Sequence, residues 1–186
     1  MLANLRALFG VVVDIVLLRR GPENLPASPQ LLAACVVLNV LLYGLAYYAL
    51  VVPRLPGESS AWPLQILVGA IVSLAWFRVA FIVARKPERF VQTMIAVFAV
   101  NTLFIPAAVP LVAALIPYLE KPGTPAPALL AFAMAIVGIW LLVVTVRIVR
   151  AAFEWSWPGS VVFVLGGNFA TVLFLGLLFG ESSKAA

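Results

Sequence analysis

Long apolar runs dominate the pattern of this chain, and short polar connectors separate them. Five runs each exceed the roughly 20 residues that a helix needs to cross a hydrocarbon core about 30 Å thick. None of them alternates apolar with polar residues as the strands of a membrane barrel do. The pattern therefore predicts an all-α fold, a polytopic transmembrane helical bundle over residues 28–180. The five predicted spans lie at about 29–52, 62–84, 90–116, 127–148 and 158–180, and a short external tail follows at 181–186.

The first 27 residues form a separate unit, in which an apolar stretch is followed by a proline-rich breaker. The apolar run Ala7–Leu18 is too short to span comfortably, and Asp14 interrupts it. Arg19 and Arg20 follow the run, where cations suit the end of a helix dipole. We therefore predict a helix that lies in the cytoplasmic membrane interface. The alternative is that this helix packs on a partner protein or on the bundle itself.

Basic residues outside the spans alternate between rich and poor connectors, and this bias orients membrane proteins. Eight lie in the N-terminal stretch and in the second and fourth connectors, whereas three lie in the other connectors and the tail. The eight are Arg6, Arg19, Arg20, Arg85, Lys86, Arg89, Arg147 and Arg150, and the three are Arg54, Lys121 and Lys184. The N-terminus is thus predicted to be cytoplasmic and the C-terminus external. The net charge of +5 suits this topology and anionic lipid, and it does not indicate nucleic acid as a partner.

The composition leaves little room for catalysis. The chain is 65% hydrophobic and has no His and a single Cys, so it lacks the ligand sets of zinc and haem. No acidic residue lies in the middle of a predicted span, which argues against a carboxylate proton relay. A phosphate-binding loop, a catalytic triad or paired catalytic carboxylates cannot be assembled either. We therefore predict a protein without enzymatic activity, cofactor or metal.

Arg78 is the one charge placed well inside a predicted span. An ionisable residue in the membrane is a candidate functional position, here a counter-ion for an anionic substrate or a lipid phosphate. The alternative is that its side chain snorkels to the cytoplasmic interface, because Arg85 follows about 10 Å further along the helix. Glu88, in the next connector, is the nearest acidic partner in sequence.

The third span carries the strongest irregularity, with Asn101 and Thr102 followed by Pro106 and Pro110. Each internal proline removes a hydrogen bond to the carbonyl four residues earlier, so the carbonyls of Thr102 and Pro106 are released. Broken helices with free carbonyls line the substrate sites of transporters. Proline kinks also occur in helices that only pack, so both interpretations stay open.

Asn39 and Asn168 complete a trio of intramembrane amides with Asn101. Such amides bond between helices or contact a solute. A water-accessible cavity shared by the three amides and Arg78 would favour transport, whereas pairing between helices in a dry bundle would favour a scaffold or subunit. Small residues at helix-packing spacing indicate a compact bundle, within one chain or between chains. They include Gly69 and Ser73; Ala131, Ala135 and Gly138; Gly166 and Ala170; and Gly167 and Thr171.

A resemblance to a known family lies in the layout of five spans, in the segment from Val16 to Pro26 and in the connector from Arg147 to Phe153. In these features the chain resembles small bacterial proteins related to the Yip family of Rab-interacting membrane proteins. The resemblance implies a non-enzymatic membrane scaffold or partner-binding protein in the bacterial cytoplasmic (inner) membrane. Its partners would be the lipid bilayer and other membrane proteins or a second copy. The Asp-Leu-Tyr-Gly-Pro motif of eukaryotic members is absent, so no site residue is carried over. The alternatives are an accessory subunit of a larger membrane complex and a small transporter or channel that uses the third span.

Overall fold

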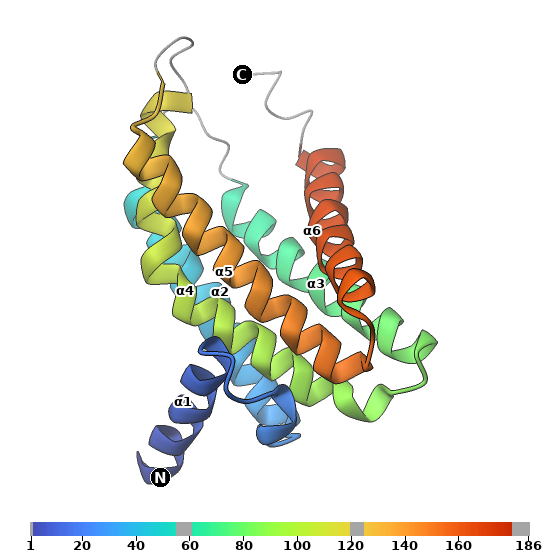
Figure 1. Ribbon diagram of the computed structural model, residues 1–186. Helices are drawn as coiled ribbons and strands as arrows, with labels where there is room; N and C mark the ends of the chain where they lie inside the picture. The colour runs from blue at the N-terminus through green and yellow to red at the C-terminus, as the bar shows by residue number, and fades with distance from the viewer. Residues whose placement is uncertain (1, 55–60, 120–124, 180–186) are drawn as a thin grey trace.

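The computed structural model describes residues 2–54, 61–119 and 125–179, and within these ranges it contains helices and no strand (Figure 1). Five of the helices are long and apolar enough to cross a membrane, which confirms the predicted all-α, polytopic transmembrane bundle. The predicted tail at 181–186 and the basic residues Lys121 and Lys184 lie outside the described residues. The α-helices are α1 (Leu2–Val16), α2 (Pro29–Leu50), α3 (Trp62–Val83), α4 (Phe90–Leu119), α5 (Ala128–Phe153) and α6 (Trp157–Phe179), with 3-10 turns η1 (Pro22–Asn24), η2 (Val52–Arg54) and η3 (Pro87–Arg89).

Local chemistry explains where several helices begin and end. Ser28 caps α2, because its hydroxyl oxygen accepts the backbone N–H of Leu31 at 3.3 Å while Pro29 occupies the first helical position. Helix α5 continues to Phe153, past the predicted end at 148, and Glu154 closes it in the left-handed conformation with φ 60°. The prediction stopped where charged residues begin, but a helix does not need apolar residues to continue into the interface.

Helix α4 runs without interruption through three internal prolines, Pro106, Pro110 and Pro117. The break that the sequence predicts in this span is therefore not an interruption of the helix. Pro106 and Pro110 are exposed, so their rings face away from the packed interior. Transmembrane helices tolerate prolines because neighbouring groups and small local adjustments satisfy the freed backbone.

Helix α4 is also the centre of the bundle. It packs against α2 and α5, while α3 packs mainly with α6 beside them (Figure 1). The side chains from Thr93 to Phe98 are all buried in succession, which happens only when a helix is covered on every side. This part of α4 lies near the end of the bundle that carries the N-terminus and the connectors between α3 and α4 and between α5 and α6 (Figure 1). We call this end of the bundle the basic end.

Helix α1 projects from the basic end and packs on the bundle through its second half (Figure 1). Val12 and Ile15 are buried in the main hydrophobic core, whereas Phe9 and Leu17 are exposed. The carboxylate of Asp14 pairs with the guanidinium of an arginine after the helix, Arg20, at 3.1 Å. The second half of α1 therefore packs on the bundle, the alternative to a helix that only lies in the interface, because two of its side chains complete the core beside α4.

Aromatic side chains close the basic end of the bundle. The ring of Phe153 lies 4.2 Å from that of Phe81, 4.4 Å from that of Trp155 and 5.5 Å from that of Phe163, measured between centroids. Phe90 meets Phe81 edge to face at 6.0 Å. We call these five residues the aromatic base. It joins α3, α4, α5 and α6 at one point, so it fixes the helices where the connectors turn.

Charged side chains tie the connectors together over the aromatic base. The carboxylate of Glu154 accepts from Lys86 Nζ and from Arg89 Nη1, each at 2.7 Å. Lys86 also donates to the carbonyl of Phe153 at 3.1 Å, and Arg89 to that of Ala152 at 3.2 Å. Cations at the last carbonyls of a helix interact well with its dipole, so this connector ion cluster also caps α5.

Neutralising Glu154 is expected to weaken the fold in a pH-dependent way. The side-chain hydrogen bond from Lys86, then that from Arg89 and the two positive charges, hold the pKa of Glu154 below its ordinary value. Its contribution to stability is therefore complete above the unfolded-state pKa of about 4.3 and is lost as the pH falls from there through the folded-state pKa. Glu154→Gln should unfold at a lower temperature than the wild type at pH 7, and this difference in unfolding temperature should disappear in acid.

Glu88→Gln is the control for this experiment. Glu88 is exposed in η3 and makes no ion pair with the described part of the chain. Its substitution should leave no difference in unfolding temperature that depends on pH. A difference of the same size at pH 7 and in acid for Glu154→Gln would mean that the cluster adds no charge-dependent stability.

Candidate ligand cavity

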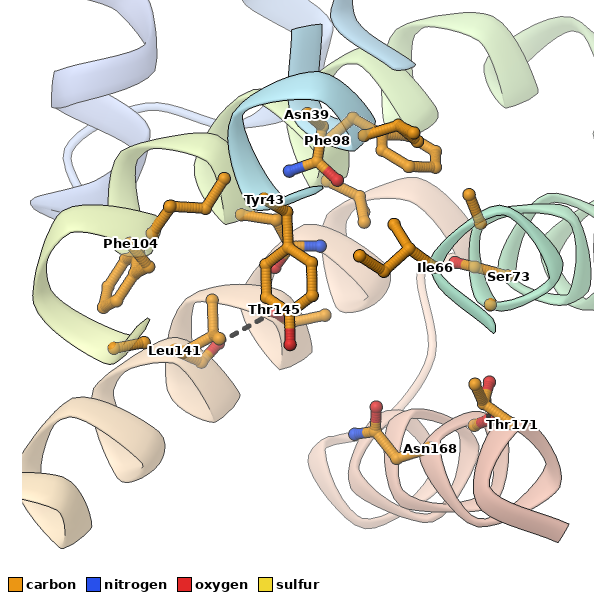
Figure 2. Close-up of a pocket in the computed structure, with 18 of the residues that line it drawn as sticks. Asn39, Tyr43, Ile66, Ser73, Phe98, Phe104, Leu141, Thr145, Asn168 and Thr171 are labelled. Atoms are coloured by element: carbon orange, nitrogen blue, oxygen red, sulfur yellow. Dashed lines mark hydrogen bonds between the residues drawn. The ribbon is translucent and has the colours of Figure 1, made fainter. Parts of the chain in front are cut away.

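A cavity of about 530 Å³ lies between α2, α3, α4, α5 and α6 (Figure 2). Its lining begins beside Tyr47 and Trp62, towards the end opposite the basic one, and reaches down to Trp76 and Phe163. Trp76 stacks on Phe163 with 5.4 Å between centroids, and Phe163 belongs to the aromatic base. The cavity therefore occupies the middle and far half of the bundle, and Trp76 and Phe163 form its floor beside the rest of the aromatic base.

The three amides singled out from the sequence, Asn39, Asn101 and Asn168, line this one cavity. They come from α2, α4 and α6, so three separate helices bring them together. Asn39 also bridges helices, because its amide donates to the hydroxyl of Thr102 at 3.1 Å, and that hydroxyl donates to the carbonyl of Phe98 at 2.8 Å. Thr102 thus connects α2 to α4, whereas Asn101 and Asn168 are held at the cavity wall.

Other polar side chains of the lining were not singled out from the sequence (Figure 2). Their signal was present on α2 and α3, where polar residues recur at the spacing of one helix face. On α2 the tyrosines follow Asn39 at intervals of four residues. Ser73 and Thr171 were named from the sequence only as packing residues, and the overlooked lining residues are Tyr43, Tyr47, Gln65, Trp76 and Thr145.

Several of these polar groups are available to a ligand. Thr145 and Thr171 are satisfied by carbonyls of their own helices, at 2.8 and 2.9 Å. In contrast, the side chains of four lining residues make no hydrogen bond within the described residues: Gln65, Ser73, Asn101 and Asn168. Gln65, Ser73 and Asn101 are half-buried and Asn168 is exposed, so their polar groups can be reached by a polar ligand or by water. The indole N–H of Trp76 has no acceptor among the described residues, but it is covered and lies against Gly167, so it is not counted among the available groups.

The lining contains no Asp, Glu, Lys or Arg among the residues that the structure describes. A charged ligand would lose its hydration without gaining a counter-ion, which is costly in a medium of low polarity. The cavity is therefore chemically suited to an uncharged molecule. In the same described residues no group of three or more His, Cys, Asp or Glu side chains is placed to hold a metal ion.

Gly167 allows the tryptophan of the floor to lie where it does. A Cβ atom at position 167 would stand 2.9 Å from Nε1 and 3.0 Å from Cδ1 of Trp76, closer than side chains normally approach. The absence of a side chain lets the indole of α3 lie directly on the backbone of α6. This contact explains one of the small-residue motifs of the sequence, since close approach requires a small residue.

The remaining candidate positions lie away from the cavity. Arg78 is exposed on α3, and its guanidinium carbon stands 5.3 Å from the centroid of the Phe90 ring. It makes no ion pair with Glu88. Pro106 and Pro110 are exposed and are not part of the lining. The structure thus brings the three amides together and leaves Arg78 and the two prolines outside the site.

The described lining of this cavity combines amide and hydroxyl groups with apolar side chains and has no charged residue. Pockets of 300–1,000 Å³ typically bind drug-sized molecules, so its size is suitable for a small ligand. Comparison with protein-family models, with curated proteins and with solved structures gives no match to this chain.

Proposed function

We propose that this protein is a non-enzymatic integral membrane protein that binds an uncharged, hydrogen-bonding small molecule in the cavity, as the binding step of a small transporter. One observation carries the proposal. The amides of Asn39, Asn101 and Asn168, from three helices, line one space whose described lining has no charged side chain. Asn101 and Asn168, which have no partner among the described residues, support transport, whereas Asn39 pairs with Thr102 between helices and Arg78 lies outside the cavity.

The proposed ligand has two parts. Amide and hydroxyl groups of the wall, such as those of Asn101 and Ser73, would bond its polar groups, because these side chains have no other partner among the described residues. The rings of Tyr43, Trp62 and Trp76 would contact its apolar part. Small amphiphiles that carry hydroxyl or amide groups fit this description, whereas organic acids and ammonium compounds do not.

The aromatic base supports access from one side only. Phe81 and Phe153 are buried and stacked at the basic end, next to Phe163 of the cavity floor, which supports entry away from that end. Transporters hold substrate near the middle of the membrane with one side closed and exchange the closed side during transport. Release to the basic side would require the aromatic base and the connector ion cluster to separate.

Cysteine accessibility tests whether the cavity is open to water. In a Cys35→Ala background, Ser73→Cys should react with a small neutral, hydrophilic thiol reagent added from the external side. Its rate should exceed that of Ala75→Cys by at least about tenfold, a barrier difference of about 1.4 kcal/mol. Ala75 is the matched control, because it lies two residues away on the exposed face of α3 and is not in the lining.

A second arm tests the ligand's charge. A cationic reagent of similar size should react more slowly than the neutral one at Ser73→Cys, because no acidic side chain of the described lining stabilises it. Equal rates for Ser73→Cys and Ala75→Cys would contradict the proposal. The cavity would then be dry or filled by lipid.

A second candidate function is a membrane scaffold of Yip-like type, or a subunit of a larger complex. The small residues Ala131 and Ala135 of α5 are exposed, whereas Gly138, the third of the stripe, is exposed at the cavity lining. Such a stripe allows close approach of another transmembrane helix. A stable monomer in mild detergent would count against this function, and an unreactive Ser73→Cys would favour it.

The proposed location is the bacterial cytoplasmic membrane, with the N-terminus in the cytoplasm. The alternation of basic connectors supports this orientation. The N-terminus and the two basic connectors gather at one end of the bundle, which agrees with it (Figure 1). Lipid is the partner that every version of the proposal requires.

A further inference from the structure

Arg78 places a charge on a surface of α3 that otherwise faces lipid. It is exposed within a helix that is long and apolar enough to span the membrane. Ile71, Val79 and Ile82, at neighbouring positions of the same surface, are exposed as well. The guanidinium therefore lies among apolar side chains at the outside of the bundle, and it does not contact the ligand cavity.

No acidic side chain of the described chain neutralises Arg78. The acids in ion pairs are Asp14, which binds Arg20, and Glu154, which binds the connector lysine and arginine. Glu88 is in no such pair. The one described contact of the guanidinium is the face of Phe90, which attracts a cation but carries no net charge. A cation in an apolar layer is costly until it finds an anion or reaches the head groups.

The position of Arg78 lets its side chain reach the head groups. It lies five residues before the end of α3 at Val83, about 7.5 Å along the helix axis, and an arginine side chain covers this distance by snorkelling. Arg85 follows at the membrane boundary, where it is exposed and forms no ion pair within the described residues. Two cations without acidic partners among the described residues thus lie near this end of α3, Arg78 within the helix and Arg85 two residues beyond it, where the backbone is left-handed with φ 56°.

We propose that Arg78, held against Phe90 and assisted by Arg85, binds the phosphate group of an anionic phospholipid in the leaflet at the basic end. A guanidinium presents a planar fork of N–H donors that matches phosphate oxygens, and stacking on a ring leaves the edge of that fork free. Lys86 and Arg89 do not take part, because the connector ion cluster occupies them. This site lies outside the ligand cavity and does not depend on the proposed transport function.

Lipid titration of the purified full chain in a neutral detergent, followed by native mass spectrometry, tests the proposal. The wild type should bind phosphatidylglycerol more tightly than phosphatidylcholine. Arg78→Gln should weaken phosphatidylglycerol binding about tenfold, which is about 1.4 kcal/mol. Arg78→Lys should give an intermediate loss, because it keeps the charge without the fork. Inorganic phosphate should not compete, since the site is reached from the lipid.

Arg54→Gln is the matched control, because it removes one positive charge at the other end of the bundle, where Arg54 donates to the carbonyl of Leu50. It should bind phosphatidylglycerol like the wild type. Equal binding by Arg78→Gln and the wild type would overturn the proposal. An equal loss in Arg54→Gln would also overturn it, because the preference would then follow net charge. Competition by inorganic phosphate would show that the site binds free phosphate and not a lipid, and it would overturn the proposal as well. Unchanged thermal unfolding of each variant shows that any loss is not due to misfolding.

Discussion

Replacing Phe153 with alanine is expected to lower the free energy of unfolding by about 3–5 kcal/mol, the usual cost of truncating a buried Phe. Its ring is 2% exposed and stacks between those of Phe81 and Trp155 at the centre of the aromatic base. Neighbouring helices meet at this point, so a cavity there cannot collapse without moving them. Unfolding by heat or by denaturing detergent, monitored by circular dichroism, measures the change.

Phe132→Ala provides the comparison on the same helix. Phe132 is 64% exposed on α5 and makes no ring contact with the described aromatic residues. Its truncation should change stability by much less than that of Phe153. If the two variants unfold alike, the aromatic base does not hold the basic end together, and the one-sided access proposed for the cavity loses its support.

Gly167→Leu is expected to displace Trp76 and to disrupt the cavity floor. The new Cβ would stand 2.9 Å from Nε1 of Trp76, and the indole cannot shift freely because it stacks on Phe163. Overpacking of this kind costs about 1–3 kcal/mol. Thermal unfolding should report the loss. Reactivity at Ser73→Cys, in the background used above, should change as well, because Ser73 lines the same cavity.

Gly176→Leu is the control for this substitution. Gly176 lies on α6 as well, but a Cβ there meets nothing within 4 Å. Both variants gain the same helix propensity, about 1 kcal/mol relative to glycine, so their difference isolates the clash. If both are equally stable and Ser73→Cys reacts equally in both, Trp76 is not fixed against Gly167, and the floor is more adaptable than the structure indicates.

Helix existence and approximate length could be predicted for the spans because both depend on local sequence. A run of apolar residues that matches the bilayer forms a helix whatever its neighbours are, since lipid leaves backbone groups no other partner. The predicted helix ends were less accurate where charged residues continue a helix beyond the apolar run. At Arg147 the predicted span was near its end, but α5 continues to Phe153. The sequence left open whether the prolines of α4 break it or only kink it, and the helix is continuous with Pro106 and Pro110 on its exposed face.

The candidate site was predicted in part. Asn39, Asn101 and Asn168 stood out as polar residues in apolar helices, and they do line one cavity. Arg78 stood out for the same reason, but it faces the opposite way, towards lipid. Sequence alone does not separate these cases, because a polar residue in a span can point inward or outward with the same neighbours in the chain.

The sequence by itself determined the five transmembrane helices, the basic end and the lack of ligand sets for zinc or haem. Only the tertiary structure decided which face of each helix turns inward. The physical reason is that lipid is as apolar as the side chains, so the hydrophobic effect does not orient a helix within the bundle. Close contacts do so instead, such as Trp76 on Gly167 and the carboxylate of Glu154 between Lys86 and Arg89. These contacts join residues far apart in the chain, and they create the cavity with its aromatic base.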